Sequence, residues 1–159
     1  MPGFLEYRES GFVKFFTEKF AKAGYYVLFY DYRGHGKTKT KYQSNWNKIF
    51  PLVTSDIHIV LEWILEHQSE RLLDDKIALV GRSLGGVIAL SHGFIDERAK
   101  ILIVLSPRYD YHKTQAKFHE ETIKRMSPYN FLKKDPSNRN RILLAHCKDD
   151  ERVPFHNLI

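Results

Sequence analysis

One short stretch of the sequence decides the fold: Ile77-Ala78-Leu79-Val80-Gly81-Arg82-Ser83-Leu84-Gly85-Gly86. It opens with an apolar run of strand length, and the compact apolar segment 84–92 that follows Ser83 is predicted to be a helix. Between them stands the pattern G-x-S-x-G, with Ser83 at the sharp turn from strand to helix. Gly81 and Gly85 leave room for that turn because glycine carries no side chain. The stretch therefore predicts a serine hydroxyl that projects above the end of a strand.

Apolar runs and helical patterns alternate along the rest of the chain. Apolar residues at helical spacing over 12–23 predict a helix that stops at Gly24, and Thr54 or Ser55 is expected to cap a second helix. Strands that are apolar on both faces and separated by helices indicate an α/β fold, a mostly parallel sheet with helices on both faces. Ligands of such sheets bind beyond the carboxyl ends of the strands. A further helix is expected over 113–126, and the other predicted strands are 25–31, 101–105 and 141–146.

Length and composition fit one globular domain. Of the 159 residues, 43% are hydrophobic and 28% are charged, a balance that excludes a disordered chain. The single cysteine, Cys147, excludes an intramolecular disulfide. The N-terminus has no signal-peptide pattern, and no apolar run reaches the roughly 18–20 residues needed to span a bilayer. We therefore expect a single partial domain over residues 1–159, located in the cytoplasm and not associated with a membrane.

The formal net charge of +6 raises the question of a nucleic-acid partner. The basic residues are dispersed, and their densest group, over 33–41, fits a solvated loop, so no nucleic acid is expected to bind. Cys147 stands alone and the histidines lack the spacing of metal ligands, so neither a metal nor a cofactor is expected. A nucleotide site built on Gly36-Lys37-Thr38 is set aside, because Asp31 stands where a P-loop needs its first glycine.

The candidate chemistry lies at the ends of two predicted strands. Ser83 is the candidate nucleophile, and the N–H of Leu84, at the start of the following helix, would supply half of an oxyanion hole. The strand over 141–146 leads into Asp149 and Asp150, just where the acid of a Ser-Asp-His triad would follow in this chain order. On the residues alone, the two aspartates fit that role equally.

The chain resembles the α/β-hydrolase superfamily, in particular its serine aminopeptidase, monoacylglycerol lipase and esterase members. Besides the turn at Ser83, the resemblance covers the D-x-x-V-P segment 150–154, the D-x-R-G-x-G loop at 31–38, and Pro2-Gly3-Phe4, which is similar to the end of an H-G-F loop. It implies a serine hydrolase that cleaves an ester or peptide bond of a small acyl or peptide substrate through an acyl-enzyme.

The resemblance also implies a role for each matching residue. Asp150 becomes the triad acid, and the Phe4 N–H joins the Leu84 N–H as the second oxyanion donor. Gly81 and Gly85 shape the elbow that carries Ser83. His35 would order its loop rather than take part in catalysis.

Two parts of the family's fold are expected to be missing, so the chain is expected to be truncated at both ends. Family members have a strand before the H-G-F loop, placed between the strands predicted here at 25–31 and 77–80, and a histidine well beyond the acid. The base is therefore open: the candidates are His146, expected to be a packing residue, His112, His119, His156, or a residue outside this chain. An uncovered sheet edge also leaves a homo-oligomer open.

The missing base gives one alternative function. A protein with this fold and no base would be a non-catalytic binding protein, since a serine without a base is a weak nucleophile. Such a protein would gain thermal stability from a ligand without turning over an ester.

Overall fold

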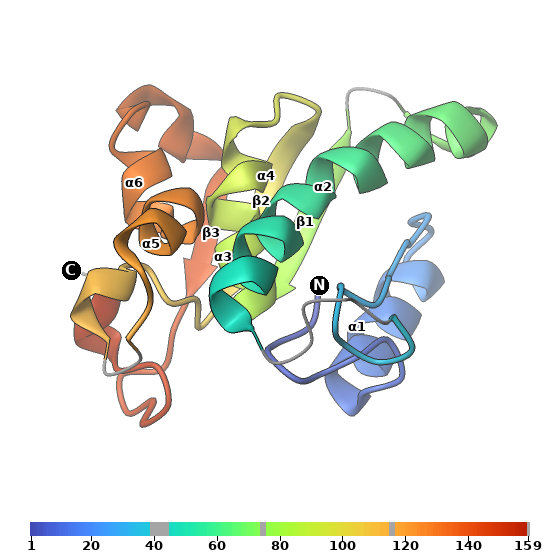
Figure 1. The fold of residues 1–159 in the computed structure, drawn as a ribbon. Helices are drawn as coiled ribbons and strands as arrows, with labels where there is room; N and C mark the ends of the chain where they lie inside the picture. Colours follow the sequence, from blue (N-terminus) through green and yellow to red (C-terminus); the bar gives the residue numbers. More distant parts are fainter. Residues whose placement is uncertain (39–44, 74–75, 115–116, 159) are drawn as a thin grey trace.

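A three-stranded parallel sheet in the order β1-β2-β3 lies at the centre of the computed structural model, which describes residues 1–38, 45–73, 76–114 and 117–158 (Figure 1). The strands are β1 (Ile77–Arg82), β2 (Ala99–Leu105) and β3 (Ile142–Ala145). They confirm the strands predicted over 77–80, 101–105 and 141–146. The parallel α/β architecture is confirmed with them.

Among the described residues helices cover one face of this sheet, whereas the sequence predicted helices on both. α3 (Leu84–Leu90) packs on β1 and β2, and α4 (His92–Ile95) packs on β2. α2 (Trp46–Gln68) packs on both of these helices, so its apolar side chains reach the core through them. On the opposite face the apolar side chains of Ile101 and Leu143 are 50% and 63% exposed. The fully buried core includes Val53, Ile57, Leu61, Val87, Ile88, Leu90 and Leu102.

The remaining helices flank this layered unit. α5 (Glu120–Met126) packs on α2, and α6 (Pro128–Leu132) packs on α3 and α4. α1 (Gly11–Lys22) confirms the helix predicted over 12–23, and Gly24 ends it with a φ of +89°. Short 3₁₀ turns lie at Ser69–Arg71, Tyr111–Lys113, Pro136–Arg141 and Phe155–Leu158.

The predicted strand over 25–31 is wrong. The segment pairs with no strand among the described residues, and Tyr25 is largely exposed. The edge of β1 is instead occupied by the first residues of the chain: the Met1 amino group donates to the Val80 carbonyl at 2.7 Å, and the Arg82 N–H donates to the Met1 carbonyl at 3.2 Å. An extended segment becomes a strand only where a neighbour takes its backbone hydrogen bonds, and this one lacks such a neighbour.

The predicted start of the second helix is also wrong, because α2 begins at Trp46. Asn45 caps it by accepting a hydrogen bond from the Lys48 N–H at 3.2 Å. Thr54, expected at the cap, lies inside the helix and donates its hydroxyl proton to the Phe50 carbonyl at 3.0 Å. Ser55 is likewise inside the helix, with its hydroxyl bonded to the Leu52 carbonyl.

Pro51 is tolerated inside α2 through a contact with α5. Proline has no N–H, so the carbonyl four residues earlier, that of Asn47, lacks its helical donor. The hydroxyl of buried Thr122 in α5 donates to this carbonyl at 3.1 Å. A side chain of α5 therefore replaces the hydrogen bond that the proline removes.

The helix predicted over 113–126 is correct only in its second half. α5 begins at Glu120, and the chain before it makes a 3₁₀ turn over Tyr111–Lys113. The Asp110 carboxylate accepts a hydrogen bond from the His112 N–H at 3.0 Å, which favours a turn at this point over a helix. Residues 115–116 of the predicted helix lie outside the described residues.

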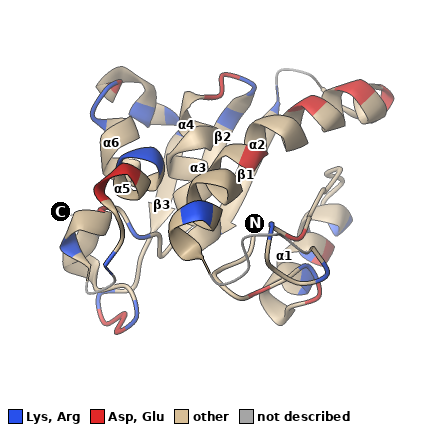
Figure 2. Cartoon of the chain, viewed as in Figure 1, with Lys and Arg blue, Asp and Glu red and all other residues tan. Residues whose placement is uncertain are grey.

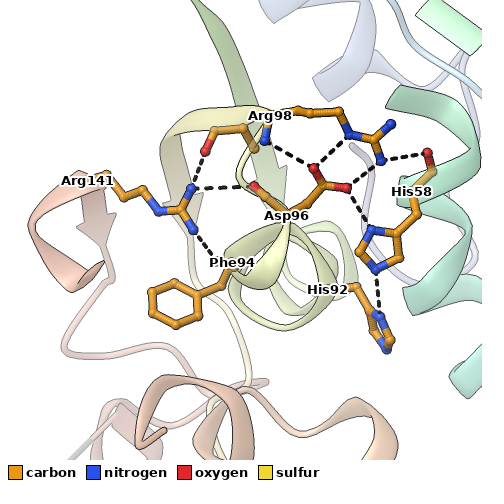
Figure 3. A network of polar contacts seen from close by, with 7 residues as sticks. His58, His92, Phe94, Asp96, Arg98 and Arg141 are labelled. Atoms are coloured by element: carbon orange, nitrogen blue, oxygen red, sulfur yellow. Dashed lines mark hydrogen bonds and ion pairs between the residues drawn. The ribbon is translucent and has the colours of Figure 1, made fainter. Parts of the chain in front are cut away.

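A network of polar contacts connects α2 and α4 at the end of the sheet where β2 begins (Figure 3). The Asp96 carboxylate accepts hydrogen bonds from Arg98 Nε at 2.8 Å and Nη2 at 2.6 Å. His58 of α2 places Nδ1 2.7 Å from Asp96 Oδ2 and Nε2 3.1 Å from Nδ1 of His92 in α4. The amino end of β2 is thus occupied by structural contacts, and the carboxyl ends of the strands are left for the candidate site.

Candidate functional site

Ser83 occupies the sharp turn between β1 and α3. Its backbone has a φ of +50° and a ψ of −113°, a region that residues with a side chain rarely adopt. Its N–H donates to the Leu105 carbonyl at the end of β2, at 2.9 Å. A Cβ added to Gly81 would lie 2.2 Å from the Gly85 carbonyl oxygen, so the turn requires glycine at position 81. The strand, turn and helix predicted from G-x-S-x-G are therefore present.

The segment that carries Phe4 lies against this turn. A Cβ added to Gly3 would be 3.5 Å from the Cβ of Ser83, and one added to Gly85 would be 2.3 Å from the Met1 carbonyl oxygen. The Pro2 carbonyl is fixed from two sides, by the Gly85 N–H at 2.9 Å and by the buried Tyr32 hydroxyl at 2.8 Å. The first residues of the chain thus form one wall beside the Ser83 turn.

The backbone donors around Ser83 fall into two groups. The Gly85 N–H is taken by the Pro2 carbonyl, and the Gly3 N–H is taken by the Glu6 carboxylate at 2.6 Å. The N–H groups of Leu84 and Phe4 donate to no acceptor within the described residues. Both donors expected for an oxyanion are therefore without an acceptor among the described residues.

Aromatic side chains fix the position of Phe4. Its ring lies 4.8 Å from the ring of Trp46, 5.5 Å from that of Phe50 and 5.6 Å from that of His35. His35 is buried, its Nδ1 lies 3.1 Å from the Arg33 carbonyl oxygen, and burial lowers its pKa. His35 therefore packs inside the structure, as expected of a residue that orders its loop.

The structure separates the two candidate acids. Asp150 accepts hydrogen bonds at Oδ1 from the N–H groups of Val153 at 2.8 Å and Arg152 at 3.0 Å, whereas Asp149 is exposed. The Val153 N–H contributes most to holding the pKa of Asp150 below its usual range, and the Ser106 hydroxyl adds to that effect. Asp150 is therefore an ionised, oriented carboxylate at neutral pH.

Ser83 and Asp150 follow strands on either side of β2. The Ser106 N–H, just past β2, donates to the Ala145 carbonyl at 2.9 Å, and the Ser106 hydroxyl is one of the groups that lower the pKa of Asp150. β1 and β3 both flank β2, so Ser83 and Asp150 follow strands that end at the same edge of the sheet.

His146 is the histidine placed beside Asp150. Its side chain is fully buried, and Nε2 lies 2.6 Å from the Val153 carbonyl oxygen and 3.7 Å from Asp150 Oδ2. The ring also packs against that of Phe155 at 5.8 Å. These contacts are those of a packing residue, as expected from the sequence.

The other candidate bases lie elsewhere. His112 places Nδ1 2.9 Å from Asp110 Oδ1 and Nε2 3.4 Å from Glu120 Oε1, and these carboxylates raise its pKa. His119 and His156 are exposed. No histidine ring within the described ranges hydrogen-bonds to the Ser83 hydroxyl.

Three contact residues of the site escaped the sequence analysis: Glu6, Tyr32 and Ser106. Glu6 contacts Arg82 and Tyr32 contacts Pro2, and no local sequence pattern predicts contacts between residues so far apart in the chain. Ser106 had a usable signal, because it comes directly after the predicted strand 101–105, at the edge of the sheet where ligands bind.

The loop at 31–38 does not have the features of a phosphate site. The Asp31 carboxylate accepts hydrogen bonds from the Arg8 N–H at 2.8 Å and the Lys37 N–H at 3.1 Å. It fills the loop so closely that a Cβ added to Gly36 would lie 2.5 Å from its carboxyl carbon. A negative charge therefore occupies the place where a phosphate would be cradled.

Basic and acidic residues are both spread over the part of the chain that the structure describes. Figure 2 shows Lys and Arg on elements throughout the molecule, interspersed with Asp and Glu. The described residues contain no group of three or more His, Cys, Asp or Glu side chains that could hold a metal ion. None of the described helices combines the length and apolar character needed to cross a bilayer.

Comparison with known proteins links this site to a family. A family model described as "Serine aminopeptidase, S33" matches residues 2–156. A solved structure of DcsB in complex with its substrate analogue is similar to the chain, with a TM-score of 0.59 and 25% identity. That match covers 69% of this chain and 35% of the other, so this chain spans about a third of the length of DcsB. No curated protein sequence matches the chain.

Proposed function

Since this chain belongs to the serine aminopeptidase family of the α/β-hydrolase superfamily, we propose that it carries the nucleophile and the acid of a serine hydrolase, Ser83 and Asp150. The reaction is the hydrolysis of an ester or peptide bond in a small acyl or peptide substrate, through an acyl-enzyme. DcsB, to which the chain is similar, was solved with a substrate analogue, which supports an enzymatic role here.

The observation that carries this proposal is the pair of unused N–H groups beside the strained turn of Ser83. Within the described residues, the neighbouring N–H groups of Gly85 and Gly3 have acceptors. The N–H groups of Leu84 and Phe4 have none. A tetrahedral intermediate on Ser83 needs two such donors at its oxyanion. The two free N–H groups support the proposal that this turn is a nucleophile elbow with an oxyanion hole.

The proposed mechanism assigns one task to each group. The Ser83 hydroxyl attacks the carbonyl carbon, its proton passes to an imidazole, and the developing oxyanion binds to the N–H groups of Leu84 and Phe4. Asp150, held ionised by the Val153 N–H, orients that imidazole and stabilises its positive charge. As the intermediate collapses, the protonated imidazole gives its proton to the leaving group, and the acyl-enzyme forms. Water then hydrolyses the acyl-enzyme by the same route.

No histidine among the described residues hydrogen-bonds to Ser83. His146 lies closest to Asp150, but its ring is fully buried, its Nε2 faces the Val153 carbonyl, and it makes no hydrogen bond to Ser83. This gap supports a second candidate function, a binding protein that holds an acyl or peptide ligand at the Ser83 turn without cleaving it.

Labelling with a fluorophosphonate probe tests the proposal, because the probe reacts with activated serines. The wild-type chain should be labelled at Ser83, and Ser83→Ala should abolish the label. Ser137→Ala, which removes an exposed serine that bonds to Asp135, is the matched control and should leave labelling intact.

The outcome also separates the two candidate functions. Absence of label on the wild-type chain, together with a ligand-dependent rise in melting temperature, would favour the binding protein. Ester hydrolysis that disappears in Ser83→Ala would exclude it.

A further inference from the structure

Glu6 connects the two segments that form the candidate site. Its Oε2 accepts a hydrogen bond from the Gly3 N–H at 2.6 Å, and its Oε1 forms an ion pair with Arg82, the residue before Ser83. Glu6 and Arg82 are 76 positions apart in the sequence. One carboxylate thus joins the segment that carries the Phe4 N–H to the strand end that carries Ser83.

Both partners of Glu6 are themselves held in place. The Arg82 guanidinium lies over the ring of Phe12 in α1, 4.6 Å from its centroid. Gly3 fits so closely that an added Cβ would be 2.9 Å from Glu6 Oε2. The Glu6 side chain is only 24% exposed, so its hydrogen bonds are partly shielded from water and gain strength from the charge.

The same contact closes the turn that carries the Phe4 N–H. The Glu6 N–H donates to the Gly3 carbonyl at 3.2 Å, which closes a tight turn with Leu5 at a φ of +60°. With the Gly3 N–H bound to the Glu6 carboxylate, the N–H of Phe4 is the next donor along the turn, and it has no acceptor among the described residues.

We propose that Glu6 is a positioning residue that holds the Phe4 N–H at the oxyanion site of Ser83. It does so by binding the Gly3 N–H with one carboxylate oxygen and Arg82 with the other. This role rests on the proposed function, because it matters for chemistry only if Ser83 is the nucleophile. Glu6 itself touches no reacting atom.

The rate of fluorophosphonate labelling at Ser83 measures the role, since the adduct places an oxygen where the oxyanion would form. Glu6→Ala removes both contacts and should slow labelling about 10- to 100-fold. Glu6→Gln keeps an acceptor for the Gly3 N–H but loses the charge that pairs with Arg82, so it should recover part of the lost rate.

Asp56→Ala is the matched control for a merely structural effect. Like Glu6, Asp56 is a partly buried carboxylate that pairs with an arginine, Arg33, and its side chain is 15% exposed. Melting temperatures of all variants are measured alongside, and labelling is followed well below them. Asp56→Ala should label at the wild-type rate even if it melts earlier.

The possible results are distinguishable. A wild-type chain that does not label overturns the proposed function and this role with it. A wild-type chain that labels while Glu6→Ala labels at the same rate overturns this role alone. Equal slowing in Glu6→Ala and Asp56→Ala, with equal losses of melting temperature, also overturns it, because the effect would then be one of stability.

Discussion

At the scale of single residues, the turn of Ser83 depends on backbone contacts that leave no space for a side chain. Gly81 approaches Gly85, and Gly85 approaches Met1, so that added Cβ atoms would overlap with carbonyl oxygens. The first contact could be expected from the sequence, since G-x-S-x-G places both glycines within one turn. The second could not, because it joins residues far apart in the chain.

Gly81→Ala should destabilise the protein by about 2–4 kcal/mol, because its Cβ would meet the Gly85 carbonyl oxygen at 2.2 Å and the backbone must shift. Gly11→Ala is the control, because nothing lies within 4 Å of a Cβ added there at the start of α1. It should change stability by less than about 1 kcal/mol. Urea unfolding measures both, and equal effects of the two substitutions would show that the turn has room for a side chain.

At the scale of elements, caps determine where a helix begins, and contacts between helices determine whether it can contain a proline. Asn45 and Thr122 both act on the first turns of α2, one as a cap and the other by binding the Asn47 carbonyl. Thr54 and Ser55 are residue types that often cap helices, yet here both hydroxyls donate to carbonyls within α2. Only the packing of α5 on α2 explains why a helix runs through Pro51.

Thr122→Val should cost about 1–2 kcal/mol, since it removes the donor that replaces the N–H missing at Pro51. In a Pro51→Ala background the helix regains its own donor for the Asn47 carbonyl, so the same substitution should cost less. A double-mutant cycle by urea unfolding measures this coupling. Strictly additive effects would contradict the compensation.

The histidine pair between α2 and α4 should make stability depend on pH. Burial lowers the pKa of His92, and the nearby charges of His58 and Arg125 lower it further, against the Arg125 carbonyl, which raises it. Unfolded His92 therefore binds its proton at a higher pH than folded His92, and stability should fall as the pH drops below about 6.5. The Asp96 pKa, held down by Arg98, adds a further loss in stronger acid.

His92→Gln should make the loss of stability between pH 7 and pH 5 shallower, because glutamine does not titrate. His119→Gln, at an exposed histidine, should leave the pH dependence as in the wild type. The measurement is the urea midpoint across this pH range. An unchanged pH dependence in His92→Gln would contradict the contribution of this network.

At the scale of the whole molecule, the two ends of the sheet have different tasks. The network of Asp96, Arg98 and His58 lies where β2 begins, and Arg141, just before β3, donates to the Phe94 and Ala99 carbonyls there (Figure 3). Ser83 and Asp150 lie where β1 and β3 end. This division follows from parallel strands, whose carboxyl ends meet at one edge.

The alternation of apolar runs and helices was enough to predict the parallel sheet, because each pattern is local. That 25–31 forms no strand among the described residues was not predictable in this way, because a strand also needs a neighbour. The base stays unassigned for a similar reason: the imidazole must be brought to Ser83 by tertiary structure, and no described histidine bonds to it.

The most direct test of the central claim is a crystal structure of the chain after reaction with a fluorophosphonate. We predict phosphorus bonded to Ser83 Oγ, with a phosphonyl oxygen about 2.7–3.1 Å from both the Leu84 and the Phe4 nitrogen atoms. An adduct on another residue, or one on Ser83 whose oxygens approach neither N–H group, would contradict the account.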